Sequence, residues 1–162
     1  MKLPLTFMFA ALIALMLFPR PSFAHGKETH SEKKNETYED DAHVEAMHEV
    51  RVKIPDNFRG LELPDWVDKG KNDARGASLY RRNCAMCHGK KGQGDGHMVS
   101  GANFKASDFS DSEHSSFYSV GEKFWIVTKG MAGMGMPPFG DRLNEEERWL
   151  LVAHILKFAR TD

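Results

Sequence analysis

NCAMCHGKKGQGDG, residues 83–96, is the stretch that decides which fold the chain can adopt. It holds the only two cysteines of the sequence, Cys84 and Cys87, and His88 follows directly. Two thiols three positions apart can face one object, and the adjacent imidazole is close enough to ligate a metal at its centre. The pattern therefore fits three kinds of site: a redox disulfide, half of a metal site, or the C-x-x-C-H attachment sequence of a c-type haem.

The surroundings of the two cysteines separate these alternatives. A redox C-x-x-C motif is typical of a βαβ context, whereas here a predicted helix leads into a glycine-rich loop. A structural zinc site needs four protein ligands, and the chain has no second C-x-x-C motif, although distant histidines could contribute. The haem alternative predicts thioether bonds to Cys84 and Cys87, with His88 as the proximal iron ligand.

A second motif, GMAGMGMPPFG at residues 130–140, offers a partner for that histidine. A haem iron that carries electrons without binding substrates needs a sixth ligand, and a methionine thioether supplies it and raises the reduction potential. We predict Met136, because the following prolines stiffen the loop, with Met134 and Met131 as alternatives. Methionine-rich loops more often fill cores, but the upstream motif and a capped helix downstream favour a ligand here.

Helical signals predominate in the second half of the chain. Apolar spacing and capping residues predict helices over residues 73–83, 121–129 and 145–159. The last is the clearest, because Asn144 is a natural N-cap and Glu147 stands at the capping-box position. No strand signal is convincing, and the connections are long and rich in Gly, Ser and Pro, so they need something to wrap around. We predict an all-α domain.

Residues 76–159 resemble the mono-haem class I cytochromes c of bacterial periplasms. The matching pieces are GASLYRRNCAMCHGKKGQGDG and SVGEKFWIVTKGMAGMGMPPFGDRLNEEERWLLVAHI, in the family's order and approximate spacing. The resemblance implies a small cytochrome c fold, in which three to five helices and long Gly/Pro-rich loops wrap around one covalently attached haem c. It also implies one-electron transfer, with His88 and Met136 as axial ligands.

The resemblance further implies that the first and last helices cross near Gly76, Tyr80 and Trp149. Two positions depart from the family pattern. His97 stands where many relatives carry a proline whose neighbourhood provides a carbonyl to the proximal histidine, so the sequence does not identify that acceptor. His154 stands where a tyrosine is common, and we predict a structural role for it at the helix crossing.

The first 24 residues predict export. Lys2 precedes an uncharged run over residues 3–18, and Ser22 and Ala24 are small residues at the positions that a signal peptidase reads. An uncleaved membrane anchor is the weaker alternative, because the run is slightly short for a span of about 20 residues. We expect residues 1–24 to be a cleaved signal peptide and the protein to be periplasmic.

Three segments follow the predicted signal. Residues 25–50 are polar and rich in His and acidic side chains, which predicts a flexible or partner-ordered extension, in which residues 40–50 could form a short helix. Residues 51–70 read as an extended lead-in that packs on the domain, and residues 71–162 as the cytochrome c domain. The extension is either a soluble tail or a weak copper or zinc site, and its histidines are His25, His30, His43 and His48.

Charge and glycine content bear on the partners. Removing Lys2 and Arg20 from the 22 basic residues leaves 20 against 23 acidic ones, a net charge of −3, which argues against nucleic acid. The glycines of the C-x-x-C-H stretch are expected to approach the flat haem and to adopt positive φ. Five lysines form either a docking rim near the haem edge or an ordinary solvated face, namely Lys90, Lys91, Lys105, Lys123 and Lys129.

The function that these signals favour is that of a one-electron carrier with redox partner proteins and no catalysis of its own. With both axial positions filled, the haem has no open site for a substrate. Two alternatives remain. The chain is either an electron-transfer subunit docked permanently on a periplasmic oxidoreductase or oxidase, with peripheral contact to a membrane complex, or a haem-based sensor or enzyme with a dissociable methionine ligand.

Overall fold

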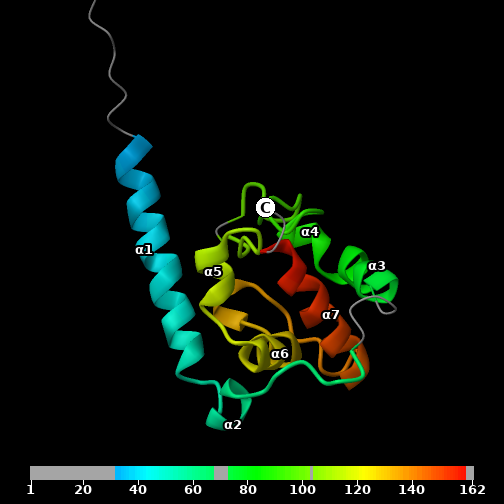
Figure 1. Ribbon diagram of the computed structural model, residues 1–162. Helices are drawn as coiled ribbons and strands as arrows, with labels where there is room; N and C mark the ends of the chain where they lie inside the picture. The colour runs from blue at the N-terminus through cyan, green and yellow to red at the C-terminus, as the bar shows by residue number, and fades with distance from the viewer. Residues whose placement is uncertain (1–31, 68–72, 103, 160–162) are drawn as a thin grey trace, which may run out of the picture.

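The structure is a computed structural model that describes residues 32–67, 73–102 and 104–159, with the backbone alone for residues 32–41. Within these ranges it has helices and loops but no strand, apart from one isolated bridge between Met131 and Met136. The predicted all-α class is confirmed (Figure 1). The elements are α1 (Glu32–Arg51), α2 (Asp56–Arg59), α3 (Asp73–Asn83), α4 (Ala85–His88), α5 (Ser112–Ser116), α6 (Val120–Lys129), the 3₁₀ turn η1 (Ala132–Met134) and α7 (Glu145–Phe158).

The predicted export signal, residues 1–24, lies outside the described residues. Within the described ranges, none of the helices is both long enough and apolar enough to span a bilayer.

Helices α3 and α7 cross at close range (Figure 1). A Cβ added at Gly76 of α3 would lie 2.8 Å from the carbonyl oxygen of Leu150 and 3.3 Å from the Cβ of His154. The two backbones therefore approach closely enough to require glycine. One turn further along α3, Tyr80 is buried and its ring centroid lies 5.2 Å from that of His154. The predicted crossing near Gly76 and Tyr80 is present.

Helices α6 and α7 each begin with a capping box, with Ser119 and Asn144 as the N-caps. The side chain of Asn144 accepts a hydrogen bond from the backbone N–H of Glu147 at 2.9 Å, and the Glu147 carboxylate accepts one from the backbone N–H of Asn144. The predicted start of the last helix is confirmed. Trp149 then joins the two helices by stacking on Phe124, with ring centroids 4.0 Å apart.

The lead-in packs along α6 before α3 begins. Ile54 and Val67 are buried, and a Cβ added at Gly121 of α6 would lie 1.9 Å from the carbonyl oxygen of Phe58. The backbone of this segment thus lies directly against α6.

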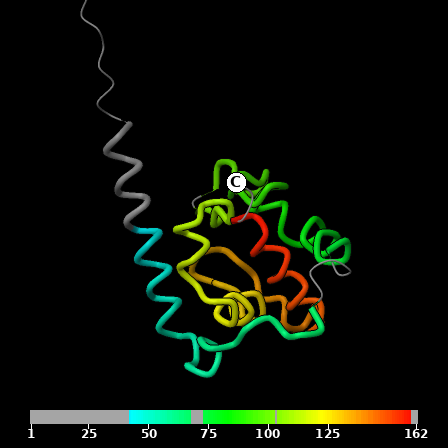
Figure 2. The backbone as a smooth tube through the Cα atoms, in the orientation of Figure 1, coloured from blue at the N-terminus to red at the C-terminus, as the bar shows by residue number. Residues whose placement is uncertain are grey.

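Helix α1 lies beside α5 and α6 along one side of the molecule (Figures 1 and 2). Its last turns dock through Met47, which is 2% exposed and packs in a cluster with Tyr118 and Met131. The Tyr118 hydroxyl donates a 2.7 Å hydrogen bond to the Met47 carbonyl. The prediction of a flexible or partner-ordered segment up to residue 50 did not include this contact, because its few apolar residues, such as Met47 and Val50, stand among polar and charged ones.

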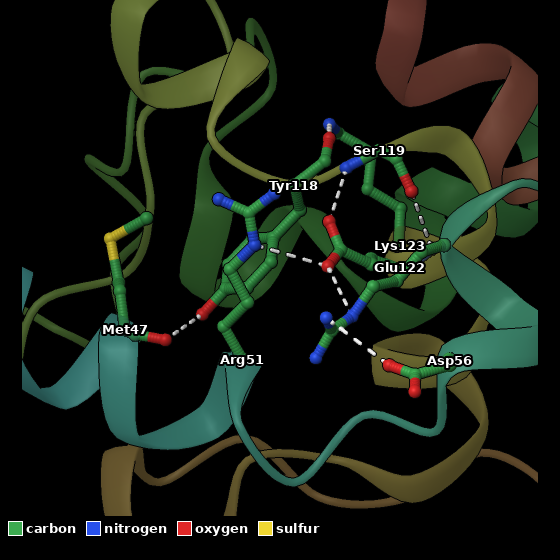
Figure 3. A network of polar contacts seen from close by, with 8 residues as sticks. Met47, Arg51, Asp56, Tyr118, Ser119, Glu122 and Lys123 are labelled. Carbon is green, nitrogen blue, oxygen red and sulfur yellow. Dashed lines mark hydrogen bonds and ion pairs between the residues drawn. The ribbon is translucent and has the colours of Figure 1, made fainter.

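A buried carboxylate holds the end of α1 to the domain. Glu122 of α6 is fully buried, and its carboxylate accepts a hydrogen bond from Nε of Arg51 at 3.1 Å (Figure 3). Nε of Arg59 lies 3.8 Å from the same oxygen. The other carboxylate oxygen accepts the backbone N–H of Ser119 at 2.7 Å. One side chain therefore joins α1, α2 and the start of α6.

Candidate functional site

The two cysteines and His88 lie at the junction between α3 and α4. Cys84 ends the ladder of α3 by donating its N–H to the Tyr80 carbonyl at 2.8 Å, and its own carbonyl accepts the N–H of His88 at 2.9 Å. The Tyr80 hydroxyl donates to the carbonyl of Gly89 at 2.9 Å, which ties the end of α4 back to α3. The single turn of α4 thus holds Cys84, Cys87 and His88 together.

These three residues line one cavity of about 320 Å³ together with the methionines of the second motif. Met131, Met134 and Met136 enter it from the loop after α6, about fifty residues away in the sequence. The volume falls within the ~300–1,000 Å³ that is usual for cofactor and ligand sites. The structure therefore brings the two sequence motifs to one place.

The thiols are free, and their environment does not suit thiol redox chemistry. No disulfide joins Cys84 and Cys87. Burial raises the pKa of the Cys84 thiol to about 12, and the neighbouring Cys87 adds to this shift. Redox-active C-x-x-C motifs need a thiolate of lowered pKa. The described residues also contain no cluster of three or more His, Cys, Asp and Glu side chains that could hold a metal ion, so neither the disulfide nor the zinc alternative gains support.

His88 is fixed by a contact that the sequence did not reveal. Its Nδ1 lies 3.0 Å from the carbonyl oxygen of Ser107, which only accepts, so Nδ1 is the donor and Nε2 keeps its lone pair. Phe109 stacks on the imidazole with centroids 4.4 Å apart. Burial lowers the pKa of His88 and favours the neutral ring. A neutral histidine with a carbonyl on its far nitrogen is the arrangement that metal-ligating histidines adopt.

Two glycines of the first motif, Gly92 and Gly94, pack against other parts of the protein rather than against the cavity. Gly94 has φ of 73°, and a Cβ there would lie 2.5 Å from the carbonyl oxygen of Ala106, next to Ser107. A Cβ on Gly92 would meet the ring of Phe158. The expected positive φ is confirmed at both positions. The expected approach to a flat ring is wrong for them, because protein atoms fill that space and neither residue lines the cavity.

The methionine loop is closed by its own backbone. Met131 donates its N–H to the Met136 carbonyl at 2.9 Å, and Met136 donates back at 3.2 Å, with η1 between them. Met131 is buried beneath α1, whereas Met136 is half-buried. Met136 also lines, with His88, a second cavity of about 60 Å³ that Met134 does not reach. Met131 and Met136 thus line both cavities, whereas Met134 lines the larger one alone.

The five lysines do not form one rim. Lys105 lines the cavity, but Lys90, Lys91 and Lys129 are exposed away from its lining. Lys123 is buried, with 9% of its surface exposed, so it belongs neither to a docking rim nor to a solvated face. The sequence analysis missed two cations that do line the cavity, Arg82 and Arg142. Each is adjacent to a motif, but sequence spacing alone does not show which side faces the site.

The other histidines of the described residues do not line the 320 Å³ cavity. His154 packs against Tyr80 and Phe158 at the helix crossing, as its predicted structural role requires. His43 lies 5.8 Å from the ring of His114, and His48 packs edge-on against Phe117. The predicted weak copper or zinc site gains no support from the described part of the chain. His25 and His30 lie outside the described residues.

Comparison with known proteins gives one family match. The model of the family described as "Cytochrome C oxidase, cbb3-type, subunit III" matches residues 71–155. No curated protein matches the chain. One similar solved structure is a chain of the Kuenenia stuttgartiensis reducing HAO-like protein complex Kustc0457/Kustc0458, with 25% identity and a TM-score of 0.49. The match covers 60% of this chain and 46% of that one, so this chain spans less than half of that neighbour's length.

Proposed function

The chain belongs to the c-type cytochrome family described as cytochrome C oxidase, cbb3-type, subunit III, and from this premise we propose that it is an exported one-electron carrier with one covalently bound haem c. When bound, the haem supplies an iron that cycles between the ferrous and ferric states. The protein supplies attachment, orientation and tuning.

The observation that carries the proposal is that one cavity gathers all the groups a c-type haem needs. Cys84 and Cys87 offer two thiols for thioether bonds, and His88 offers Nε2 as the proximal ligand. Met136 offers a thioether from the opposing loop. The donor set therefore fits a six-coordinate haem, and a methionine ligand favours the ferrous state.

Surrounding residues hold the donors in place. The Ser107 carbonyl and the Phe109 ring fix the plane of the His88 imidazole. The paired backbones of Met131 and Met136 fix the base of the methionine loop. If His88 and Met136 both bound the iron, no open coordination site would remain for a substrate, which favours electron transfer over catalysis.

Three measurements test the proposal. A pyridine haemochrome spectrum of the denatured protein should show haem c, and Cys84→Ala with Cys87→Ala should abolish covalent attachment. In the oxidised protein, Met136→Ala should remove the charge-transfer band that reports iron–sulfur ligation, while Met134→Ala should retain it. Loss of the band in Met134→Ala alone would refute Met136 as the ligand. Sequencing the amino terminus of the periplasmic protein should place its start after Ala24.

A second candidate is suggested by the description of the family itself, which names an oxidase subunit. In this case the chain would deliver electrons as a permanent part of a periplasmic oxidoreductase or oxidase. The docked helix α1 lies outside the matched residues and offers an additional surface. Purification from native membranes as a stable complex would favour the subunit, whereas a monomeric protein in the periplasmic extract would favour the free carrier.

A further inference from the structure

We propose that Lys123 is the counter-ion of a haem propionate at the end of the haem site formed by the 60 Å³ cavity. The inference rests on the proposed haem function and adds a residue that neither motif contains. It starts from a buried ammonium group that forms no ion pair with a carboxylate of the described residues.

Lys123 lies near the start of α6 and is 9% exposed. Its Nζ donates to the carbonyl of Ser115 at 2.5 Å and to the carbonyl of Tyr118. Within the described residues these neutral carbonyls are its acceptors, and no carboxylate lies within ion-pairing distance. Glu122 is its neighbour in the sequence, but the carboxylate of Glu122 is bound by Arg51 and the Ser119 N–H.

Burying such a group is unfavourable unless a negative charge compensates it. Moving an ammonium ion into a protein interior costs several kcal/mol even after relaxation. Burial lowers the pKa of Lys123 to about 8, although Glu122 partly opposes the shift. The amine is therefore still mostly protonated at neutral pH, and a carboxylate beside it would stabilise both charges.

The position of Lys123 identifies that carboxylate. The residue lines the 60 Å³ cavity but not the larger one, whereas Cys84 and Cys87 line the larger cavity but not the small one. Four residues line both, namely His88, Ser107, Met131 and Met136. Along the two cavities, His88 and Met136 therefore lie between the cysteines and Lys123.

The haem has the same order of groups across its plane. Its vinyl edge is fixed by the thioethers, its iron lies at the centre, and its two propionate carboxylates lie on the far side from the vinyl groups. A haem attached at Cys84 and Cys87 with its iron between His88 and Met136 would direct this acidic edge towards Lys123.

Other charges near this end leave an excess of cations. Arg51 and Arg59 share Glu122, and Arg59 also pairs with Asp56 at 3.2 Å (Figure 3). Lys123 is the cation of this group that lines the cavity. The other cations of the site, Arg82, Lys105 and Arg142, line the larger cavity on the side of the cysteines, so Lys123 supplies the lysine charge at the small cavity.

Three variants of the full-length holoprotein separate this role from a structural one. Lys123→Gln keeps a donor for the Ser115 and Tyr118 carbonyls but removes the charge, and Lys123→Arg keeps the charge. Lys129→Gln removes the same charge from an exposed position of the same helix. The readouts are the midpoint potential, the propionate bending bands of the resonance Raman spectrum and the unfolding temperature.

We expect Lys123→Gln to lower the midpoint potential, because an uncompensated propionate stabilises ferric iron, and to shift the propionate bands. Lys123→Arg and Lys129→Gln should stay close to wild type in both. A Lys123→Gln protein that matches wild type in potential and bands would overturn the inference, even if its unfolding temperature fell, because Lys123 would then only join α5 to α6. Equal shifts from Lys123→Gln and Lys129→Gln would overturn it too.

Three further outcomes are also decisive. Holoprotein from Lys123→Arg but none from Lys123→Gln would support a requirement for the charge, and holoprotein from neither would refute it. A wild-type protein without covalent haem would instead refute the proposed function, before any variant is made.

Discussion

The imidazole of His88 and the carbonyl of Ser107 form a 3.0 Å hydrogen bond across nineteen residues of sequence. This bond sets the tautomer of the imidazole, and in metal-binding histidines a hydrogen bond of this kind raises the basicity of the ligating nitrogen. The loop that carries Ser107 is held in turn by the N–H of Phe109, which donates to the carbonyl of Gly92 at 2.6 Å. The glycine loop and the proximal histidine are therefore mechanically linked.

This link predicts the effect of Gly94→Ala. The new Cβ would lie 2.5 Å from the carbonyl oxygen of Ala106, and the residue would keep a positive φ. We expect the unfolding free energy to fall by about 1–3 kcal/mol, and the midpoint potential to rise as the Ser107 carbonyl moves away from His88. Chemical denaturation and redox titration measure the two effects.

Gly101→Ala is the matched control for this variant. Gly101 also has a positive φ, of 77°, but a Cβ there would meet nothing within 4 Å. The Gly101→Ala variant should lose about 1 kcal/mol of unfolding free energy through backbone strain, and its midpoint potential should not change. An equal rise in potential in both variants would show that strain alone, rather than the Ser107 contact, is responsible.

A second prediction concerns the crossing of α3 and α7. Gly76→Ala would place a methyl group 2.8 Å from the Leu150 carbonyl oxygen and force the helices apart, at a cost of about 1–3 kcal/mol. Gly60→Ala, where a Cβ has open space, should leave the midpoint of urea unfolding nearly unchanged. If both variants unfold at the same urea concentration as wild type, the close approach at Gly76 has no energetic weight.

Short-range signals account for what the sequence predicted well. Asn144 and Glu147 form a capping box within four residues, and their geometry needs no information from the rest of the chain. The spacing of Cys84, Cys87 and His88 is likewise set by one helical turn. Local chemistry of this kind predicts the helices of the core and the identity of the site.

Long-range contacts account for what it missed. The Ser107 carbonyl is a backbone group, so no side-chain type marks it as the partner of His88. Lys123 looks like any surface lysine in the sequence, and its burial follows from the folding of α5 over the start of α6. Met47 becomes a core residue only because Tyr118 and Glu122 meet α1.

A third prediction tests the attachment of α1 through Glu122. Glu122→Gln leaves the Arg51 guanidinium without its carboxylate and weakens the capping box at Ser119. Because the Arg51 side chain is 43% exposed, water offsets part of the loss. We expect the free energy of unfolding to fall by about 2–3 kcal/mol. Relative to wild type, the rate of amide hydrogen exchange should increase more in α1 than in α7.

The control for this variant is Asp56→Asn, which removes an exposed partner of Arg59 and should change neither stability nor exchange measurably. Uniform acceleration of exchange across all helices in Glu122→Gln would contradict a local clasp, because it would mean that the carboxylate supports the whole domain.

A fourth prediction concerns pH and His154. Burial, with a smaller effect of Arg81, lowers the pKa of His154 below its ordinary value of 6.5. The unfolded chain therefore takes up a proton at a higher pH than the folded protein does. The contribution of neutral His154 to the free energy of unfolding is fully present above pH 6.5. It falls as the pH drops below that value, until the folded histidine is also protonated.

His154→Tyr replaces the titrating ring by one that stays neutral in this range and can still pack against Tyr80 and Phe158. We expect the loss of unfolding free energy between pH 7 and pH 5 to be smaller in this variant than in wild type. His97→Tyr, at an exposed position, should keep the wild-type slope. An unchanged slope in His154→Tyr would mean that other groups carry the acid sensitivity, and that the histidine at the helix crossing takes up its proton equally readily in both states.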